Sequence, residues 1–224
     1  VPCVSKGNTT TGQIQIHPGQ EKIHAQNHWE NKVFAHIGPE GTGPNKNAIL
    51  RRIYKRRVSI FKSIDKIQNT QQFDIIIFAV KPQIATKVMK KFIGLKYNKK
   101  VLFVSVIAGK KISFFNNFLP RNNQFIRVMP NMPSMVEEGV SCLVTNKNTS
   151  KQNKYIATDL FGKVGKIYWL GNEKELDKVT AISGSGPGYY FLFIDLLEKA
   201  AVKLGFTRKI AKELVYQTAF GSVK

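Results

Sequence analysis

Short apolar runs alternate with amphipathic stretches along residues 32–171 of the chain. The runs have the length of β-strands, and in the stretches between them apolar side chains recur at helical spacing. Residues 73–82 and 100–109 are apolar at almost every position, which is typical of parallel strands that are covered on both faces. The alternation therefore predicts an α/β fold with a doubly wound parallel sheet.

Prolines, glycines and polar turns separate the predicted elements. The expected strands cover residues 32–38, 58–64, 73–82, 100–109, 125–133, 140–146 and 165–171. The expected helices between them cover residues 45–57, 83–94, 112–119 and 150–165.

After Gly171 the strand pattern stops and only helical periodicity remains. Helices are expected at residues 173–183, 188–204 and 208–224. Gly205 is suited to end the second of these, and Thr207 to cap the third. We expect a second, all-helical domain that is cut off, because the apolar face continues to Lys224 without a stop signal.

The chain is strongly basic, with 35 Lys and Arg against 14 Asp and Glu. Such a charge can indicate a nucleic-acid-binding protein. Many lysines, however, stand among Asn and Ile in exposed-looking positions, so a general compositional bias is the favoured reading and no nucleic-acid partner is expected. No apolar run reaches the roughly 18 residues of a membrane span. Two cysteines form no disulfide framework, which favours a reducing, cytoplasmic location.

The string AISGSGPGYYFLFIDLLEKA (181–200) places glycines and a proline before a long apolar run. A dinucleotide-binding turn has to follow a strand, and this string follows a predicted helix, so that reading fails. Two readings remain. Ser183 or Ser185 could cap a helix with Pro187 in its first turn, so that free N–H groups bind a carboxylate or phosphate. Alternatively, the glycines permit a close crossing of two helices.

Four strings follow one another along the chain: AVKP (79–82), VSVIAG (104–109), RVMPNMPSMVEEG (127–139) and DKVTAISGSGPGYYFLFIDLLEKAAVKLGF (177–206). Their order and spacing resemble those of the pyrroline-5-carboxylate reductases over roughly residues 32–224. The last two strings are specific, whereas AVKP has near variants in other β-hydroxyacid-type dehydrogenases.

The resemblance implies a Rossmann-like NADP-binding domain at residues 31–172 and the start of a helical substrate and dimerisation domain at 173–224, after an uncertain segment at 1–30. It implies reduction of 1-pyrroline-5-carboxylate to L-proline, the last step of proline biosynthesis. NADPH is the expected cofactor, with NADH as the alternative. A homodimer or larger ring is the expected assembly.

Site residues also follow from the resemblance, some of them with a structural alternative. Residues near the cofactor are expected to be Ala79, Val80, Lys81, Pro82, Ser105, Ile107, Ala108, Gly109 and Asn131. Residues near the substrate are expected to be Glu173, Thr180, Ser183, Gly184, Ser185 and Gly186. Lys81 could instead be one more solvated lysine, Glu173 a surface acid and Thr180 a helix-packing hydroxyl. The resemblance assigns no single catalytic residue.

Two departures from the family pattern leave an inactive fragment or relative as the alternative function. The family's first glycine-rich turn would lie before Val33, where the nearest string, SKGNTTTG (5–12), lacks the first and last glycine. The string GPEGTG (38–43) lies where the family meets the 2′-phosphate of NADPH. The family's Ser-Pro-Gly-Gly-Thr-Thr loop would follow residue 224.

All four histidines lie in the first 36 residues. His24 and His28 have i, i+4 spacing, which suits a metal on a helix, but no third ligand stands in a recognisable pattern. We therefore expect no metal site.

Overall fold

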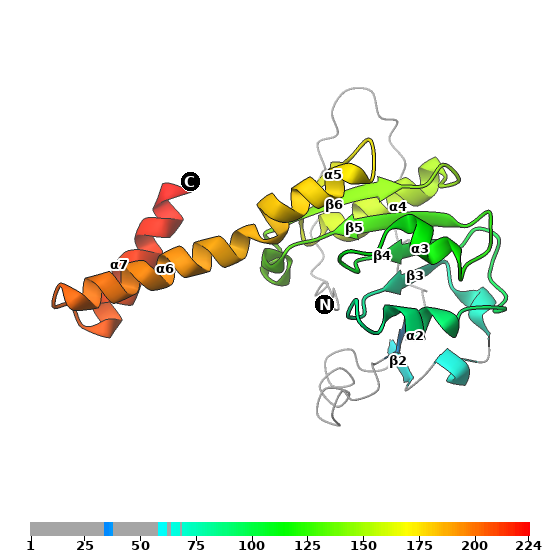
Figure 1. Cartoon of the computed structure of the whole chain (residues 1–224), viewed down its shortest axis with the longest axis horizontal. Coiled ribbons are helices and arrows are strands. Elements are labelled where there is room, and N and C mark those ends of the chain that lie inside the picture. Colours follow the sequence, from blue (N-terminus) through cyan, green and yellow to red (C-terminus); the bar gives the residue numbers. More distant parts are fainter. Residues whose placement is uncertain (1–33, 38–57, 62–63, 68) are drawn as a thin grey trace, which may run out of the picture.

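The computed structural model describes residues 34–37, 58–61, 64–67 and 69–224 of the chain (Figure 1). The predictions for residues 1–30, for the helix at 45–57 and for the string at 38–43 lie outside these residues. So do His24 and His28.

The centre of the described structure is a five-stranded sheet in the order β3-β4-β5-β6-β7. Its strands are β3 (Ile75–Phe78), β4 (Leu102–Ser105), β5 (Gln124–Met129), β6 (Gly139–Thr145) and β7 (Gly165–Trp169). A separate parallel pair consists of β1 (Phe34–Ile37) and β2 (Val58–Phe61). These strands lie within or next to the expected runs, and the α/β fold class is confirmed.

One strand pairing departs from the expected parallel sheet, so that β6 and β7 run opposite to β3, β4 and β5. The pairs β3–β4, β4–β5 and β6–β7 are parallel, but β5 and β6 are antiparallel. The connection at residues 130–138 holds only the short 3-10 helix η4 (Met132–Val136). A parallel crossover needs about a dozen residues or more, so this connection is too short and the chain turns back.

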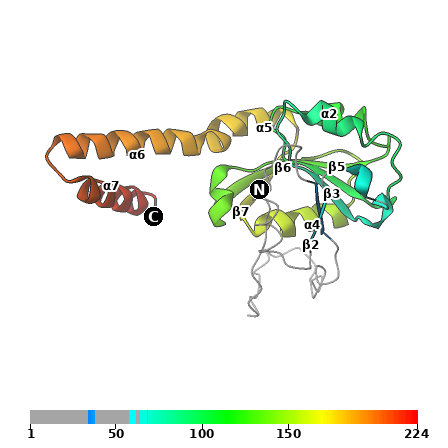
Figure 2. The same cartoon turned by 90° about the horizontal axis from the view of Figure 1, so that it is seen from below.

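Helices cover both faces of the sheet, as a doubly wound fold requires (Figure 2). On one face α2 (Ala85–Lys90), α3 (Ile112–Asn116) and α5 (Lys174–Val179) bury side chains against a core that includes Phe78, Phe103 and Phe125. On the other face α4 (Lys151–Gly162) packs on Leu102, Val104, Ile126, Val128 and Leu143. The short 3-10 helices η2 (Ile64–Lys66) and η3 (Thr70–Gln72) precede β3.

The two strands expected to be covered on both faces differ in burial. All four residues of β4 are buried, as predicted, but Ile77 of β3 is 45% exposed. The reason is position, because β4 lies between two strands whereas β3 is an edge strand of the five-stranded sheet. Helix α2 is also shorter than the expected 83–94.

The last helices leave the sheet (Figures 1 and 2). A π-helical turn, η5 (Thr180–Gly184), joins α5 to the long helix α6 (Gly186–Lys203), and α7 (Arg208–Ser222) folds back beside α6. The Oγ1 atom of Thr207 accepts a hydrogen bond from the Ile210 N–H at 3.3 Å, so the predicted cap of α7 is confirmed. Among the described residues, no helix combines the length and the apolar character that crossing a membrane demands.

Candidate functional site

Three segments with predicted cofactor residues meet at one edge of the sheet. Because β3, β4 and β5 are parallel, their carboxyl ends lie side by side, with Phe78 in register with Ser105 and Ser105 in register with Arg127. The segments that follow these strands are residues 79–82, 106–109 and 130–131. Open α/β sheets bind ligands outside the carboxyl ends of their strands. The fold therefore brings the predicted cofactor residues together.

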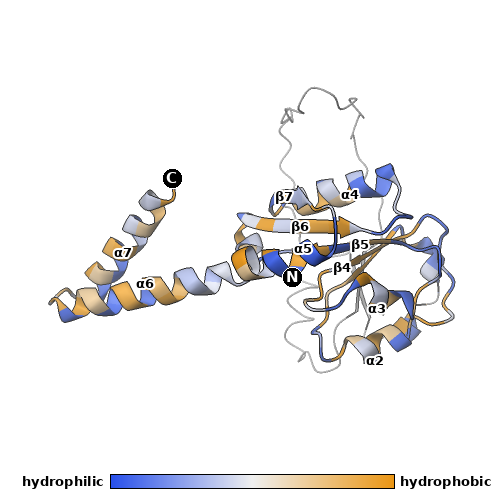
Figure 3. Ribbon diagram, turned by 45° about the horizontal axis from the view of Figure 1, so that its top comes forward, coloured by the Kyte–Doolittle hydropathy of each residue, from blue (hydrophilic) through white to orange (hydrophobic). Residues whose placement is uncertain are grey.

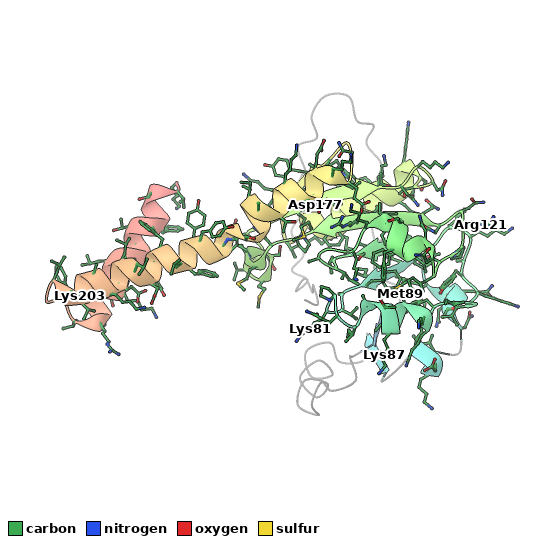
Figure 4. The ribbon with its side chains drawn as sticks, viewed as in Figure 1. Lys81, Lys87, Met89, Arg121, Asp177 and Lys203 are labelled. Atoms are coloured by element: carbon green, nitrogen blue, oxygen red, sulfur yellow. The ribbon has the colours of Figure 1, made fainter. Side chains whose placement is uncertain are left out.

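The residues of the segment after β3 differ in exposure. Ala79 and Lys81 are exposed, whereas Val80 and Pro82 are half-buried. The Lys81 side chain extends away from the sheet (Figure 4). Its ammonium group is exposed among the described residues.

A hydrogen bond within the turn after β4 fixes its shape. Ser105 is fully buried, and its Oγ atom accepts a hydrogen bond from the Ile107 N–H at 3.1 Å. The Ile107 side chain is also buried. Ala108 and Gly109 are exposed, and Gly109 has a φ of +70°, a conformation that favours glycine. Ser105 and Ile107 thus shape the turn, and Ala108 and Gly109 present its surface.

Asn131 fixes the loop after β5. Its Oδ1 atom accepts a hydrogen bond from the Val140 N–H at 2.8 Å, and its carbonyl oxygen accepts one from the Ser134 N–H at 3.2 Å. The amide side chain therefore ties the start of β6 to the end of β5. Its role in the structure is to set the path of this loop.

Two glycines let η4, β6 and β7 approach closely beneath that loop. A Cβ atom on Gly139 would collide with Ser134, and one on Gly165 would collide with the Gly139 carbonyl group. Gly165 also has a φ of +138°. The Ser134 hydroxyl is buried here, and it has no hydrogen-bond partner among the described residues.

The helix start expected at Ser183–Pro187 does not form as predicted. Ser185 is itself helical (φ −87°, ψ −23°) and provides no side-chain cap, and its N–H donates to the Thr180 carbonyl oxygen at 2.8 Å. The Ser183 hydroxyl donates to the Val179 carbonyl oxygen at 3.3 Å. The expectation of a Ser183 or Ser185 cap is therefore wrong, because the helix continues from α5 into α6 through the π-turn.

Pro187 gives a physical reason for that turn. It stands in the first turn of α6, as predicted. A proline inside a continuous helix lacks the N–H that would bond the carbonyl four residues earlier, and its ring clashes with that carbonyl. The extra residue of a π-turn relieves such a conflict, and π-turns are frequent at functional sites.

Gly184 brings this segment to the carboxyl edge. A Cβ atom built on Gly184 would lie 3.1 Å from Met129 Cε and 3.5 Å from Thr180 Cγ2. Met129 is the last residue of β5, two residues before Asn131. The close contact thus joins a helical turn to a strand end, not to a second helix. The Thr180 hydroxyl donates to the Leu176 carbonyl oxygen at 2.8 Å. Around Gly186 and Gly188 a Cβ atom would meet nothing within 4 Å among the described residues.

The Glu173 carboxylate accepts hydrogen bonds from residues of its own chain. One carboxylate oxygen, Oε1, accepts hydrogen bonds from the Ile112 N–H at 2.8 Å and from Arg127 Nη1 at 3.0 Å. Arg127 is only 3% exposed, and its Nη2 lies 3.9 Å from Asp177 Oδ1. Sequence reasoning missed Arg127, although an arginine inside the apolar strand at 124–129 is a signal, since buried charges need partners.

The described part of the protein holds no candidate metal site. Among the described residues, no three His, Cys, Asp or Glu side chains gather as a metal site would require.

These features together define a class of protein: an α/β fold of the Rossmann-like type, followed by a projecting helical part. The helical part matches the family model for pyrroline-5-carboxylate reductase dimerisation over residues 173–224. The pyrroline-5-carboxylate reductase of Haemophilus influenzae is 33% identical over 174 residues, which are 78% of this chain and 64% of that protein. The Arabidopsis thaliana enzyme is 36% identical over 165 residues, 74% of this chain and 58% of that protein.

A solved structure agrees. The Plasmodium falciparum pyrroline carboxylate reductase, crystallised with NADP bound, superimposes with a TM-score of 0.67 at 32% identity, covering 86% of this chain and 68% of that one. The chain belongs to the pyrroline-5-carboxylate reductase family. It spans less than two thirds of the length of the two curated relatives named above.

Proposed function

We propose that the protein reduces 1-pyrroline-5-carboxylate to L-proline with a hydride from NADPH. The observation that carries this proposal is the meeting of two sets of residues at one sheet edge. The segments after β3, β4 and β5 lie there together, and Gly184 brings the π-turn against Met129 at the same place. A hydride donor and its acceptor require such a shared edge.

The residues at the edge fit a dinucleotide. Ala108 and Gly109 expose a turn with little side chain, and a Cβ on Gly109 would meet nothing within 4 Å among the described residues, so a flat ring could approach the backbone. Lys81 is exposed at the end of β3 and would attract the phosphates. NADPH, when bound there, supplies the hydride.

The residues of the chain itself would position the cofactor and the substrate. Asn131 and Ser105 hold the two turns that would flank the nicotinamide end, each through a hydrogen bond to a backbone N–H. Ser183, Gly184, Ser185 and Gly186 stand on the π-turn and the start of α6, where the ring and carboxylate of the substrate would lie. The resemblance implies that Glu173 and Thr180 lie near the substrate. We propose instead that they set this segment in place, since both side chains bond to their own chain.

A second copy of the chain is the proposed partner. Four large side chains at i, i+3, i+4 and i+7 form an exposed stripe on α6: Tyr189, Leu192, Phe193 and Leu196. Figure 3 shows apolar colour along α6 and α7, away from the sheet. Exposed apolar surface of this extent marks an interaction site. The match of residues 173–224 to a dimerisation domain supports a homodimer, in which residues 31–172 would form the cofactor domain of each copy.

The location remains a proposal as well. Cys142 is a free thiol in the described part of the chain. A thiol of this kind accords with a reducing, cytoplasmic compartment.

The test is a kinetic assay of the full-length protein. NADPH absorbance is expected to fall when 1-pyrroline-5-carboxylate is added, and L-proline is expected to accumulate in equal amount. The same reaction without the imine is the control. A rate no higher than that control, in protein shown to be folded, would favour an inactive relative instead.

A further inference from the structure

Arg127 carries a charge in the middle of the sheet. It lies on β5, in register with Ser105 of β4 and Val144 of β6, and only 3% of it is exposed. A guanidinium group in such a place is costly unless it is paired and hydrogen-bonded. The acidic side chains that it reaches, Glu173 and Asp177, both belong to the segment that forms α5. Among the described residues, the acidic partners of this charge are therefore in place only when α5 is docked.

The partner of Arg127 has a second contact that reaches the cofactor side. The same Glu173 oxygen accepts the N–H of Ile112, the first residue of α3. The cap residue of α3, Lys111, makes no side-chain cap, so Glu173 satisfies an N–H that helix starts leave open. Ile112 lies three residues after Gly109. One oxygen atom thus joins the start of α3, just after the turn at residues 106–109, to the start of α5.

The π-turn η5, which follows α5, meets the same strand. Side chains two residues apart on a strand point to the same face, so Arg127 and Met129 both face α5. Glu173 bonds to the first, and Gly184 packs against the second. Leu176, fully buried in the core of that face, holds α5 to the sheet but fixes no direction along it. Among the described residues, the directional contacts of this segment centre on Arg127, which bonds to Glu173 at the start of α5 and lies 3.9 Å from Asp177 within it.

We propose that Arg127 is a positioning residue for the substrate half of the site. Acting through Glu173, it sets the place of residues 180–186 relative to residues 105–109. This inference rests on the reductase function proposed above. It differs from a direct substrate role for Glu173, because here the carboxylate acts on its own chain.

The experiment uses the full-length protein with four variants and one control. Arg127→Met and Glu173→Ala remove the contact. Arg127→Lys keeps the charge without the forked geometry, and Glu173→Gln keeps an acceptor oxygen without the charge. Lys163→Met is the control, since it removes a surface ion pair with Asp159 on and just after α4. Steady-state kinetics and hydrogen–deuterium exchange are measured for each.

A displacement of about 1 Å in a reacting group can cost roughly a hundredfold in rate. For Arg127→Met and Glu173→Ala we expect kcat/KM for the imine to fall by between about tenfold and a hundredfold, with the KM for NADPH within about threefold. Glu173→Gln is expected to lose several-fold less than Glu173→Ala, and Arg127→Lys less than Arg127→Met. Amide exchange in residues 180–186 is expected to rise in the two disruptive variants and to stay unchanged in Lys163→Met.

Two results would overturn the proposal. The first is unchanged exchange at residues 180–186 in Arg127→Met. The second is a fall of kcat/KM in Glu173→Ala without a rise in amide exchange at residues 180–186, which would make Glu173 a direct substrate contact. If Arg127→Met does not fold, Arg127→Lys and Glu173→Ala decide the question. If the unmodified protein shows no reductase activity, the proposed function fails, and the exchange data still decide whether Arg127 holds the segment.

Discussion

Gly184 packs against Met129 so closely that a methyl group on Gly184 would lie 3.1 Å from Met129 Cε. This contact joins two parts of the chain that are far apart in sequence, the end of β5 and the π-turn before α6. That methyl group would stand closer than an ordinary carbon–carbon contact of about 3.5–4.0 Å. The atom opposite Gly184 is the end of a flexible methionine side chain, which can move aside.

The Gly184→Ala protein is therefore expected to fold with nearly unchanged stability but to have a higher KM for the imine. Met129 can shift by a few tenths of an ångström, so the free energy of unfolding should change by less than about 1 kcal/mol. The added methyl group presses against Met129 and Thr180 and so shifts the π-turn that carries the proposed substrate residues. The KM for the imine should therefore rise about tenfold, which corresponds to about 1.4 kcal/mol. Thermal unfolding and steady-state kinetics measure the two effects. Gly188→Ala, where a Cβ meets nothing within 4 Å, is the control. A Gly184→Ala protein with the KM of the unmodified protein would contradict the substrate assignment.

Gly165→Ala tests the packing beneath the β5–β6 loop. The residue has a φ of +138°, and its Cβ would collide with the backbone carbonyl of Gly139, which has no flexible end to move. Strain and overpacking add, so the variant is expected to lose more than about 3 kcal/mol of stability. Denaturant unfolding measures this loss. Gly162→Ala, whose Cβ would lie 3.7 Å from Ile167 Cδ1, is the matched control and should change stability by less than about 1 kcal/mol. Equal effects of the two changes would show that the close approach is not rigid.

The features that sequence reasoning predicted correctly are those that local patterns determine. The run at 100–109 gave a buried β4, and Thr207 gave the cap of α7, because hydrophobic periodicity and capping act within a few residues. The predicted cofactor residues meet at one edge for a related reason. Parallel strands place their carboxyl ends together once their order is known.

The features that it missed depend on distant contacts. Arg127 and Glu173 are 46 residues apart, so no local pattern reveals that they pair. The direction of β6 follows from the length of a connection, and the π-turn follows from the conflict between Pro187 and a helix that continues past Ser183. In each case tertiary structure overrides a local expectation, here that of a helix start capped by serine.

Tyr97 is expected to make the free energy of unfolding depend on pH in the alkaline range. Burial raises the pKa of its hydroxyl far above the usual value of about 10, and the hydroxyl donates to the Phe92 carbonyl oxygen at 2.8 Å. Because the folded state holds this proton more strongly than the unfolded state, the contribution is complete below about pH 10 and is lost as the pH rises toward the folded pKa. Tyr97→Phe should therefore cost about 1 kcal/mol at neutral pH, and this difference should shrink above about pH 10. Denaturant unfolding of both proteins at neutral pH and above about pH 10 measures this difference. A gap that stays constant would argue against the raised pKa.

The α6 stripe predicts the effect of a single charge on assembly. Phe193 is 60% exposed at the centre of the stripe, where a second copy would bury it. Glutamate at this position would have to lose its hydration on association, which is costly for an unpaired charge. Phe193→Glu in the full-length protein is therefore expected to lower the mass of the assembly to that of a smaller species, as measured by light scattering. Since the proposed pairing adds stability at high protein concentration, the melting temperature of the variant should also lose its concentration dependence. Gln152→Glu, which makes the same charge change on an exposed position of α4, should leave the mass unchanged. An unchanged mass in Phe193→Glu would place the contact between copies elsewhere on the chain.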